Sequence, residues 1–328
     1  MYLVTGGAGF IGSNIVAALE EKGLGPIVVC DRLRSADKWK NLAKRELADI
    51  IQPDELSDFL DTHRGSIEAI FHMGAISATT ETDADKIIEN NFKLSLHLWN
   101  WCTENHTRFI YASSAATYGD GENGFVDDTD LDEQAKLRPL NPYGWSKVLF
   151  DRRILRKIDG GEPQPPQWAG LKFFNVFGPN EYHKGTMQSV VSHIYPKAAA
   201  GETATLFKSH HPDYEDGGQT RDFIWVGDCI NVMMWLIDNP KVSGVFNCGT
   251  GTSRTFLDLA KAVYTALGKE PDISFVPTPE QIRDKYQYFT EADMTKLRDA
   301  GFDGQFTSLE EGIRQYVQDY LHVEDSYK

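Results

Sequence analysis

MYLVTGGAGFIG, residues 1–12, is the stretch that decides the fold of this chain. Residues 1–5 are apolar enough for a buried strand, and residues 13–19 repeat apolar side chains at helical spacing. Between them lies a G-x-x-G-x-x-G spacing, whose glycines allow a tight turn, close approach of a pyrophosphate and close packing of helix on strand. The free N–H groups at the start of such a helix bind phosphate. The stretch therefore predicts a unit that binds a dinucleotide through Gly6, Gly9 and Gly12.

An acidic residue follows the next predicted strand, residues 27–30. Asp31 lies ~20 residues beyond the glycines, where a carboxylate contacts the adenosine ribose of a bound dinucleotide. Arg32, Arg34 and Lys38 come directly afterwards, and cations there can hold a 2′-phosphate. Asp31 by itself favours NAD, and a solvated basic loop is the alternative interpretation of the three cations. We predict NADP as the cofactor, with NAD as the alternative.

The composition is that of an ordinary globular protein. With 328 residues, 41% of them hydrophobic, the chain is long enough for one large domain or two. Its net charge of −15 argues against nucleic acid or an anionic membrane as a partner. No apolar run approaches the ~18 residues that a membrane span requires, and no signal peptide is recognisable. We therefore expect a cytoplasmic protein.

The cysteines and histidines predict neither disulfides nor a metal site. The 4 cysteines are widely scattered without C-x-x-C spacing, which is typical of buried thiols in a reducing compartment. His210 and His211 stand beside carboxylates in a polar segment, residues 208–219. Adjacent histidines in an acidic loop seldom supply a tetrahedral site, so we predict no bound metal.

Two further predicted strands end in residues suited to ligand binding. Residues 67–72 lead into a loop of small residues at 73–77, and residues 108–112 lead into Ser113 and Ser114. Ligands of doubly wound sheets bind at the carboxyl ends of the strands. A serine there can hydrogen-bond a substrate oxygen, although a turn serine is the alternative. The pattern predicts an α/β fold with a doubly wound, parallel Rossmann sheet and a smaller mixed α/β domain.

A tyrosine and a lysine four residues apart form the candidate catalytic pair. Pro142 is a natural helix opener, so Tyr143 and Lys147 fall on one face of a helix. A cation beside a phenol favours the phenolate, so a tyrosine with an ordinary pKa of ~10 can act as a base nearer neutral pH. An isolated Y-x-x-x-K is more often a surface pair, and the motifs around this one favour catalysis.

Three motifs in order carry a family resemblance. G-x-x-G-x-x-G at 6–12, S-S-x-x-x-Y-G at 113–119 and Y-x-x-x-K at 143–147 resemble the extended short-chain dehydrogenase/reductases of the nucleotide-sugar group. The resemblance covers essentially the whole chain. It implies an NADP-binding Rossmann domain at 1–175, to which a segment at about 220–250 returns, and a mainly substrate-binding domain at 176–328.

Further stretches narrow the resemblance to the ADP-L-glycero-D-manno-heptose 6-epimerases. They are FFNVFGP at 173–179, HKGTM at 183–187 and RDF at 221–223. HKGTM discriminates best, because UDP-hexose 4-epimerases are not expected to carry its lysine. The resemblance implies a small-molecule ADP-sugar substrate, a role in supplying lipopolysaccharide core precursors, and a homo-oligomer, namely a pentamer.

The activity implied by the resemblance is inversion at C6 of ADP-D-glycero-D-manno-heptose through a 6-keto intermediate, with NADP bound throughout. Tyr143 would be one acid/base, and Lys184 the second, its pKa lowered by neighbouring positive charge or by desolvation. A loop lysine that binds an anion is the alternative for Lys184. Lys147 would also hold the nicotinamide ribose, and Ser114 would hydrogen-bond the reacting oxygen.

The resemblance also implies a larger set of contact residues. The chain departs from the family pattern in two places. Met73 and Ile76 replace more polar residues, and Pro53 stands where a lysine would support a 2′-phosphate, which argues against NADP. The predicted cofactor contacts are Gly6, Gly9, Phe10, Ile11, Gly12, Asp31, Arg32, Lys38, Met73, Gly74, Ala75, Ile76, Ser77, Asn90 and Lys147. The predicted substrate contacts are Ser114, Asn175, Val176, Lys184, Thr186, His193, Phe207, Arg221 and Tyr286.

Three rival functions remain at this stage. A UDP-hexose 4-epimerase is disfavoured by Lys184, and a 4,6-dehydratase is disfavoured because Ala115 and Ala116 follow Ser114 where an Asp-Glu pair is common. The third is a Rossmann protein that binds dinucleotide without catalysis. Such proteins usually lose one member of the catalytic pair, and this chain keeps both.

Overall fold

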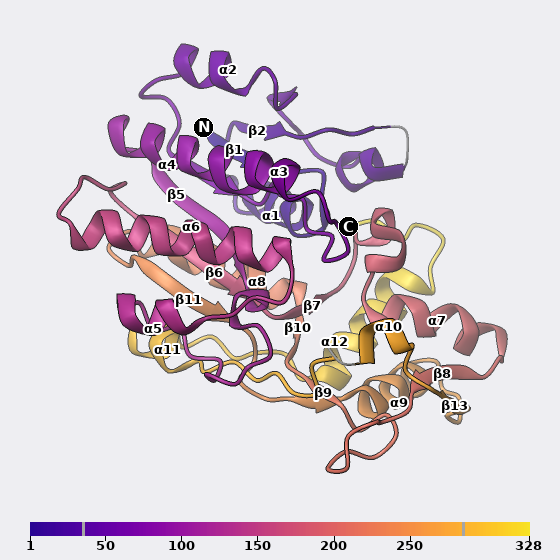
Figure 1. Ribbon diagram of the computed structural model, residues 1–328. Coiled ribbons are helices and arrows are strands. Elements are labelled where there is room, and N and C mark those ends of the chain that lie inside the picture. Colours follow the sequence, from indigo (N-terminus) through magenta and orange to yellow (C-terminus); the bar gives the residue numbers. More distant parts are fainter. Residues whose placement is uncertain (35–36, 284–285) are drawn as a thin grey trace.

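This computed structural model describes residues 1–34, 37–283 and 286–328, and within them seven strands form one parallel sheet (Figure 1). The order across the sheet is β11-β6-β5-β4-β1-β2-β3, so the strand order reverses between β1 and β4. Ligands of such sheets bind at this reversal point, outside the carboxyl ends of the strands. The predicted doubly wound α/β class is confirmed. The strands are β1 (Tyr2–Thr5), β2 (Ile27–Cys30), β3 (Asp49–Ile51), β4 (Ala69–His72), β5 (Arg108–Ser114), β6 (Trp168–Phe173) and β11 (Gly244–Cys248).

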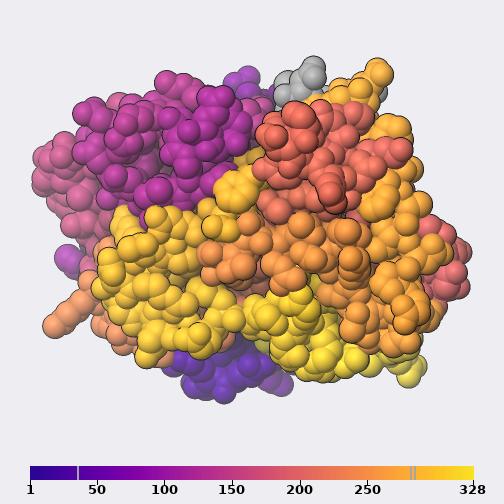
Figure 2. Space-filling model, turned by 90° about the horizontal axis from the view of Figure 1, so that it is seen from below, coloured from indigo at the N-terminus to yellow at the C-terminus, as the bar shows by residue number. Residues whose placement is uncertain are grey.

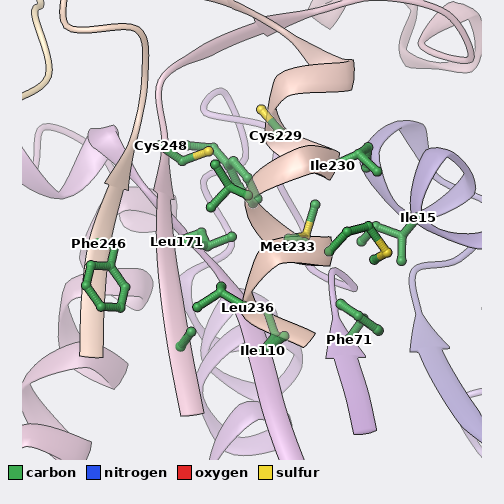
Figure 3. Packing of buried hydrophobic residues seen from close by; sticks show 14 of the residues in the cluster. Ile15, Phe71, Ile110, Leu171, Cys229, Ile230, Met233, Leu236, Phe246 and Cys248 are labelled. Carbon is green, nitrogen blue, oxygen red and sulfur yellow. The ribbon is translucent and has the colours of Figure 1, made fainter. Parts of the chain in front are cut away.

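Helices cover both faces of the sheet, which explains why its inner strands are apolar on both sides. One face packs on α1 (Phe10–Glu21) and α8 (Val226–Asp238). In Figure 3, Met233 of α8 lies over Phe71 and Ile110 of the sheet. The alternate strand residues form the second core, which the other helices of the first half cover. These helices are α2 (Leu56–Thr62), α4 (Leu94–Glu104) and α6 (Pro142–Asp159).

A smaller body with its own core follows the sheet in the second half of the chain. Figure 2, seen from below, shows residues of the second half of the chain, in orange and yellow, over much of the visible face. Its strands pair in twos as β7 (Asn175–Phe177) with β10 (Phe223–Trp225), β8 (Ala204–Phe207) with β13 (Ile273–Val276), and β9 (Thr220–Arg221) with β12 (Arg254–Thr255). Its larger helices are α7 (Val190–Ala200), α9 (Phe256–Ala266) and α12 (Leu309–Gln315).

Short helical segments fill most of the connections. Of the helices within the described residues, none combines the length and the apolar character that crossing a membrane requires. The short segments are η1 (Asp37–Leu42), α3 (Ala84–Ile87), η2 (Ile88–Lys93), η3 (Ala115–Tyr118), α5 (Leu131–Lys136), η4 (Tyr182–Met187), α10 (Glu280–Arg283), α11 (Thr295–Asp299) and η5 (Tyr316–Leu321).

Two element boundaries in the second half of the chain are defined by hydrogen bonds of the residues at their ends. The first is the passage from β6 to β7, because β6 ends at Phe173 and β7 begins at Asn175 in another sheet. The N–H of Phe174 still bonds the carbonyl of Cys248 (3.1 Å), whereas the N–H of Asn175 bonds that of Asp222 (3.0 Å). The chain thus changes partners between two adjacent residues, Phe174 and Asn175. The second is the start of α12 at Leu309, where the Ser308 side chain caps the helix.

Candidate active site

The glycine loop forms the floor of a cleft at the reversal point of the sheet. Gly6 has a φ of +66°, and a Cβ on Gly12 would lie 2.2 Å from the Gly6 carbonyl oxygen. Any larger side chain at Gly12 would therefore push the helix off the loop. Helix α1 starts at Phe10, and among the described residues no side chain caps it at Gly9. Its first N–H groups are consequently available to a phosphate.

Asp31 braces this loop from the end of β2. Its side chain is 9% exposed and accepts hydrogen bonds from the N–H of Ala8 (2.9 Å), the N–H of Arg32 (2.7 Å) and Nζ of Lys38 (2.6 Å). Lys38 therefore offsets the charge of a nearly buried carboxylate. The guanidinium of Arg32 pairs instead with the exposed Asp54 at 3.0 Å. With Arg34 and others, Arg32 lines a separate open cavity beside Asp31.

The loop at 73–77 is tied down by an asparagine that was not among the predicted contacts. Asn91 accepts a hydrogen bond from the N–H of Ile76 (2.8 Å) and donates to the Ile76 carbonyl (3.0 Å) and to Oγ of Ser146 (3.0 Å). Its neighbour Asn90 donates to the carbonyl of Lys86 (2.8 Å), on the outer side of the same helix. Neighbouring asparagines look equivalent in a sequence, and only the orientation of η2 separates them.

Tyr143 meets Ser114 because α6 packs closely on the turn after β5. A Cβ on Gly144 would lie 2.6 Å from the Ala116 carbonyl oxygen, so glycine permits this approach. Burial raises the pKa of Tyr143, and a hydrogen bond with Ser114 opposes that rise. Burial lowers the pKa of Lys147 to about 8, and the charge of Asp151 opposes this fall.

The expectation that Lys147 lowers the pKa of Tyr143 is wrong for the ligand-free protein. Nζ of Lys147 donates to the Ala112 carbonyl (2.7 Å), and the largest influence on Tyr143 is burial, which favours the neutral phenol.

A buried ion pair lies beneath the catalytic pair, and the sequence did not indicate it. Nζ of Lys172 is 2.9 Å from Oδ2 of Asp151, and both side chains are 0% exposed. Asp151 also accepts hydrogen bonds from the hydroxyls of Tyr111 (2.8 Å) and Ser113 (2.7 Å). Asp151 follows Lys147 by one helical turn, and Ser113 precedes Ser114. The pair therefore fixes the strand and the helix that carry the reactive groups.

Lys184 enters the cleft on η4, from the second half of the chain. Its ammonium lies 5.1 Å from the ring centroid of Phe10, and burial lowers its pKa while Glu181 opposes the shift. This direction agrees with desolvation, one of the two causes expected. Burial also lowers the pKa of His183 to about 4, so that imidazole is neutral at pH 7. Gly185 then turns the chain with a φ of +57°, which favours glycine.

A second cavity adjoins the cofactor cleft and shares Ser114 and Tyr143 with it. The cleft measures about 350 Å³ and the second cavity about 570 Å³. Arg221 lines the second cavity, with its guanidinium 5.5 Å from the ring centroids of both Phe256 and Tyr286. Ser114 and Tyr143 thus stand where two ligands would meet.

The predicted residues fall into three places and a remainder. The cofactor cleft is lined by Gly6, Gly9, Phe10, Ile11, Gly12, Asp31, Lys38, Met73, Gly74, Ala75, Ser77, Ser114, Tyr143, Lys147, Val176 and Lys184. The second cavity is lined by Ser114, Tyr143, Asn175, Arg221 and Tyr286, and a third of about 560 Å³ by Thr186, His193, Phe207 and Tyr286. Outside the cofactor cleft lie Arg32, Ile76 and Asn90.

Sequence reasoning missed several residues of the site. His183 and Met187 line the cofactor cleft, and Thr79, Thr80 and Gln287 line the second cavity. Asp222 is buried and accepts hydrogen bonds from Thr250 and from the N–H groups of Gly251 (2.9 Å) and Ala292 (3.1 Å). It thereby fixes the segment that follows Tyr286. Its position directly after Arg221 was the one available signal.

Comparison with known proteins agrees with this geometry. Residues 2–249 match the NAD dependent epimerase/dehydratase family. The chain is 52% identical over 332 residues to the ADP-L-glycero-D-manno-heptose-6-epimerase of Nitratidesulfovibrio vulgaris (strain DP4), covering 100% of both chains. It is 48% identical over 335 residues to the enzyme of the same name from Fusobacterium nucleatum, again covering 100% of both.

Solved structures share the fold across more than one activity. The Helicobacter pylori ADP-L-glycero-D-manno-heptose-6-epimerase matches with a TM-score of 0.78 at 26% identity, covering 97% of this chain and 95% of that one. A UDP-N-acetylglucosamine 4-epimerase from Methanobrevibacter ruminantium M1 matches with a TM-score of 0.80 at 25% identity, covering 97% and 96%. Backbone shape alone therefore does not separate these activities.

Proposed function

Because this chain belongs to the ADP-L-glycero-D-manno-heptose-6-epimerases of the NAD dependent epimerase/dehydratase family, we propose that it inverts C6 of ADP-D-glycero-D-manno-heptose. The observation that carries the proposal is that Tyr143 and Lys184, from different halves of the chain, line one dinucleotide cleft. Inversion requires a proton-transfer group for each face of the reacting carbon, and this cleft holds two.

The cleft fits a dinucleotide, because its glycine loop leaves room for a pyrophosphate and Asp31 stands at the ribose position. Gly6, Asp31 and Lys147 would hold the dinucleotide, which would supply the hydride acceptor for C6 and the hydride that reduces the 6-keto sugar. The net redox change is zero, so added cofactor is not consumed.

The chain's own residues handle the protons. Burial shifts the pKa of Lys184 down and that of Tyr143 up, which sets one group as a base and the other as an acid. We assign removal of the C6 hydroxyl proton to the Lys184 amine and protonation of the 6-keto oxygen to the Tyr143 phenol, with the roles exchanged in the reverse reaction. Ser114, bonded to Tyr143, orients the oxygen.

Lys147 and Arg221 hold ligands in this account. Nζ of Lys147 is anchored on the Ala112 carbonyl and lies in the cofactor cleft, where it holds the nicotinamide ribose. Arg221, whose guanidinium lies 5.5 Å from two ring centroids and donates to the Thr220 carbonyl (2.8 Å), presents its charge to the diphosphate of the ADP-sugar. The aromatic rings restrict its position, so its charge is ready before the substrate arrives.

We propose NADP as the cofactor. Lys38 supports this choice, because its ion pair with Asp31 offsets the charge that would repel a 2′-phosphate. Calorimetric titration tests it, with NADP expected to bind more tightly than NAD, and Lys38→Ala expected to lose most of that preference. Equal affinity for the two dinucleotides would contradict it. A homo-oligomer, a pentamer by resemblance, stays a prediction.

The function is tested by NMR with ADP-D-glycero-D-manno-heptose and with UDP-glucose, in separate tubes and without added cofactor. We expect the heptose to reach its L-glycero epimer and UDP-glucose to stay unchanged. Tyr143→Phe and Lys184→Met should each remove most of the turnover while dinucleotide stays bound. Conversion of UDP-glucose instead would identify a 4-epimerase, and bound dinucleotide without turnover of either sugar would identify a non-catalytic protein.

A further inference from the structure

The loop that carries Lys184 rests on a distant part of the chain. We call residues 180–187 the lysine loop and residues 325–328 the terminal strap. The hydroxyl of Tyr182 donates to the Ser326 carbonyl (2.7 Å), and the Tyr182 and Tyr327 rings meet edge to face with centroids 5.2 Å apart. The N–H of Lys328 donates to Oδ1 of Asn180 (3.1 Å). The strap therefore contacts the lysine loop through hydrogen bonds and an aromatic pair.

The other side of the strap contacts the segment that follows β2. Nζ of Lys44 pairs with Asp325 at 2.8 Å and also donates to the Tyr327 carbonyl. Lys40 of η1 places its ammonium 5.9 Å from the Tyr327 ring centroid. Figure 1 places the C-terminus between these two parts of the chain. The strap thus bridges η1, which supplies Lys38 to the cofactor cleft, and the loop that supplies Lys184.

A buried asparagine marks where the two bridged segments meet. The Asn41 amide donates to the carbonyls of Ala8 (2.9 Å) and Asn180 (3.0 Å) and lies 3.3 Å from Nδ1 of His183. Asn41 therefore joins the glycine loop to the lysine loop from inside, and the strap closes the same junction from outside.

The lysine loop has one short 3-10 helix, η4, as regular structure of its own. Asn180 adopts a φ of +73° and Gly185 a φ of +57°, so the backbone leaves helical geometry at the first residue of the loop and again inside η4. Inside it, the N–H of Lys184 bonds the Glu181 carbonyl (3.0 Å). So short a helix takes its position from its neighbours, which are α7, through the Glu181 carboxylate and the Ser192 hydroxyl (3.1 Å), and the strap. Small displacements of a reacting group are costly to rate.

We propose that the terminal strap is a positioning element that holds the lysine loop against η1 and so places Lys184 in the cofactor cleft. Tyr327 of the strap and Tyr182 of the lysine loop are the positioning residues, and both act through Lys184. The inference rests on the proposed function where it concerns turnover, and it stands on the contacts alone where it concerns the loop.

Hydrogen exchange followed by mass spectrometry tests the loop without any substrate. In Tyr327→Ala, amides 182–187 should exchange about fivefold faster or more, since the loop loses its outer support. Tyr327→Phe should match wild type, because Tyr327 contributes its ring and backbone to these contacts but not its hydroxyl. Val323→Ala, a change of a nearby exposed side chain, is the matched control. Unchanged exchange at 182–187 in Tyr327→Ala would overturn the proposal.

Kinetics on the same variants test positioning. We expect kcat to fall about tenfold in Tyr327→Ala, with KM and dinucleotide affinity nearly unchanged, and Tyr327→Phe to restore it. Tyr182→Phe, which keeps the ring and removes the hydrogen bond to Ser326, should show a smaller effect in the same direction. A fall in dinucleotide affinity equal to the fall in kcat would indicate a general structural role and contradict positioning. If the wild-type protein does not turn over the heptose, the proposed function fails. The hydrogen-exchange result would still show whether the strap holds the lysine loop.

Discussion

Replacing Asp151 by asparagine tests how much the buried Asp151–Lys172 ion pair contributes to stability. Asp151 and Lys172 are both fully buried, and the carboxylate accepts hydrogen bonds from Tyr111, Ser113 and Lys172. An asparagine keeps the shape but removes the charge, and it turns an NH₂ group toward one of these donors. Breaking a buried ion pair from one side costs about 3–5 kcal/mol, because the remaining charge has no counter-ion. We expect the free energy of unfolding to fall by about that amount.

Chemical denaturation followed by tryptophan fluorescence measures this change at a fixed protein concentration. Asp159→Asn, an exposed aspartate near the end of the same helix, is the control and should stay within about 0.5 kcal/mol of wild type. The double variant Asp151→Asn with Lys172→Met should lose less than the sum of the single variants, since neither charge is then stranded. A loss below about 0.5 kcal/mol for Asp151→Asn, or strict additivity in the double variant, would refute the reasoning.

The same substitution has a second, independent consequence. The charge of Asp151 opposes the burial that lowers the pKa of Lys147 to about 8. Without that charge the pKa of Lys147 falls further, so its cation is lost at a lower pH. The alkaline limb of the pH–kcat profile should therefore move toward lower pH in Asp151→Asn. A limb that stays in place would show that the charge of Asp151 does not influence the pKa of Lys147.

Three further predictions concern the ligand sites. Asn91→Ala should weaken dinucleotide binding about tenfold, because the 73–77 loop loses hydrogen bonds that contribute about 1–2 kcal/mol. Asn90→Ala should leave dinucleotide affinity unchanged. Calorimetry measures both affinities, and equal losses would contradict the placement of Asn90. Arg221→Lys should raise KM for the ADP-sugar about tenfold with kcat little changed, because lysine cannot form a bidentate contact with a diphosphate. A fall in kcat with unchanged KM would show that Arg221 does not contribute to binding of the ground-state substrate. Because Lys184 must be neutral to accept a proton and its pKa is lowered by burial, kcat/KM should decline as pH falls through that pKa, and this acid limb should be absent from the residual activity of Lys184→Met.

The sequence predicted the parts of the site that depend on local spacing. The glycine loop, Asp31, and the Tyr143–Lys147 pair each need neighbours within one strand, turn or helix, so their residue types and intervals are visible in the chain. Their placement in one cleft follows from the parallel sheet, whose strand ends meet at one edge.

The remaining features depend on contacts between distant segments. In the sequence, Lys172 has the pattern of a solvent-facing polar residue in a strand. In the structure its side chain is buried against Asp151, which belongs to another element. The division between β6 and β7 occurs within FFNVF, where no glycine or proline marks a break. The bridge from Lys44 through Tyr327 to Tyr182 joins three parts of the chain, and no local pattern predicts such a contact.

The direction of the Tyr143 pKa shift shows the same limit. Helical spacing correctly predicts that Tyr143 and Lys147 share a helix, but it does not give the depth of burial or the partner of the ammonium. Desolvation of the phenol then outweighs the attraction expected from a neighbouring cation.

The central claim is inversion at C6 by removal and return of the same hydride. The most direct measurement uses ADP-D-glycero-D-manno-heptose deuterated at C6, incubated with wild-type protein in ordinary water without added cofactor and followed by NMR. The account predicts the L-glycero epimer with its deuterium still at C6. Product that has exchanged its C6 deuterium for solvent hydrogen, or no product while bound dinucleotide is present, would contradict it.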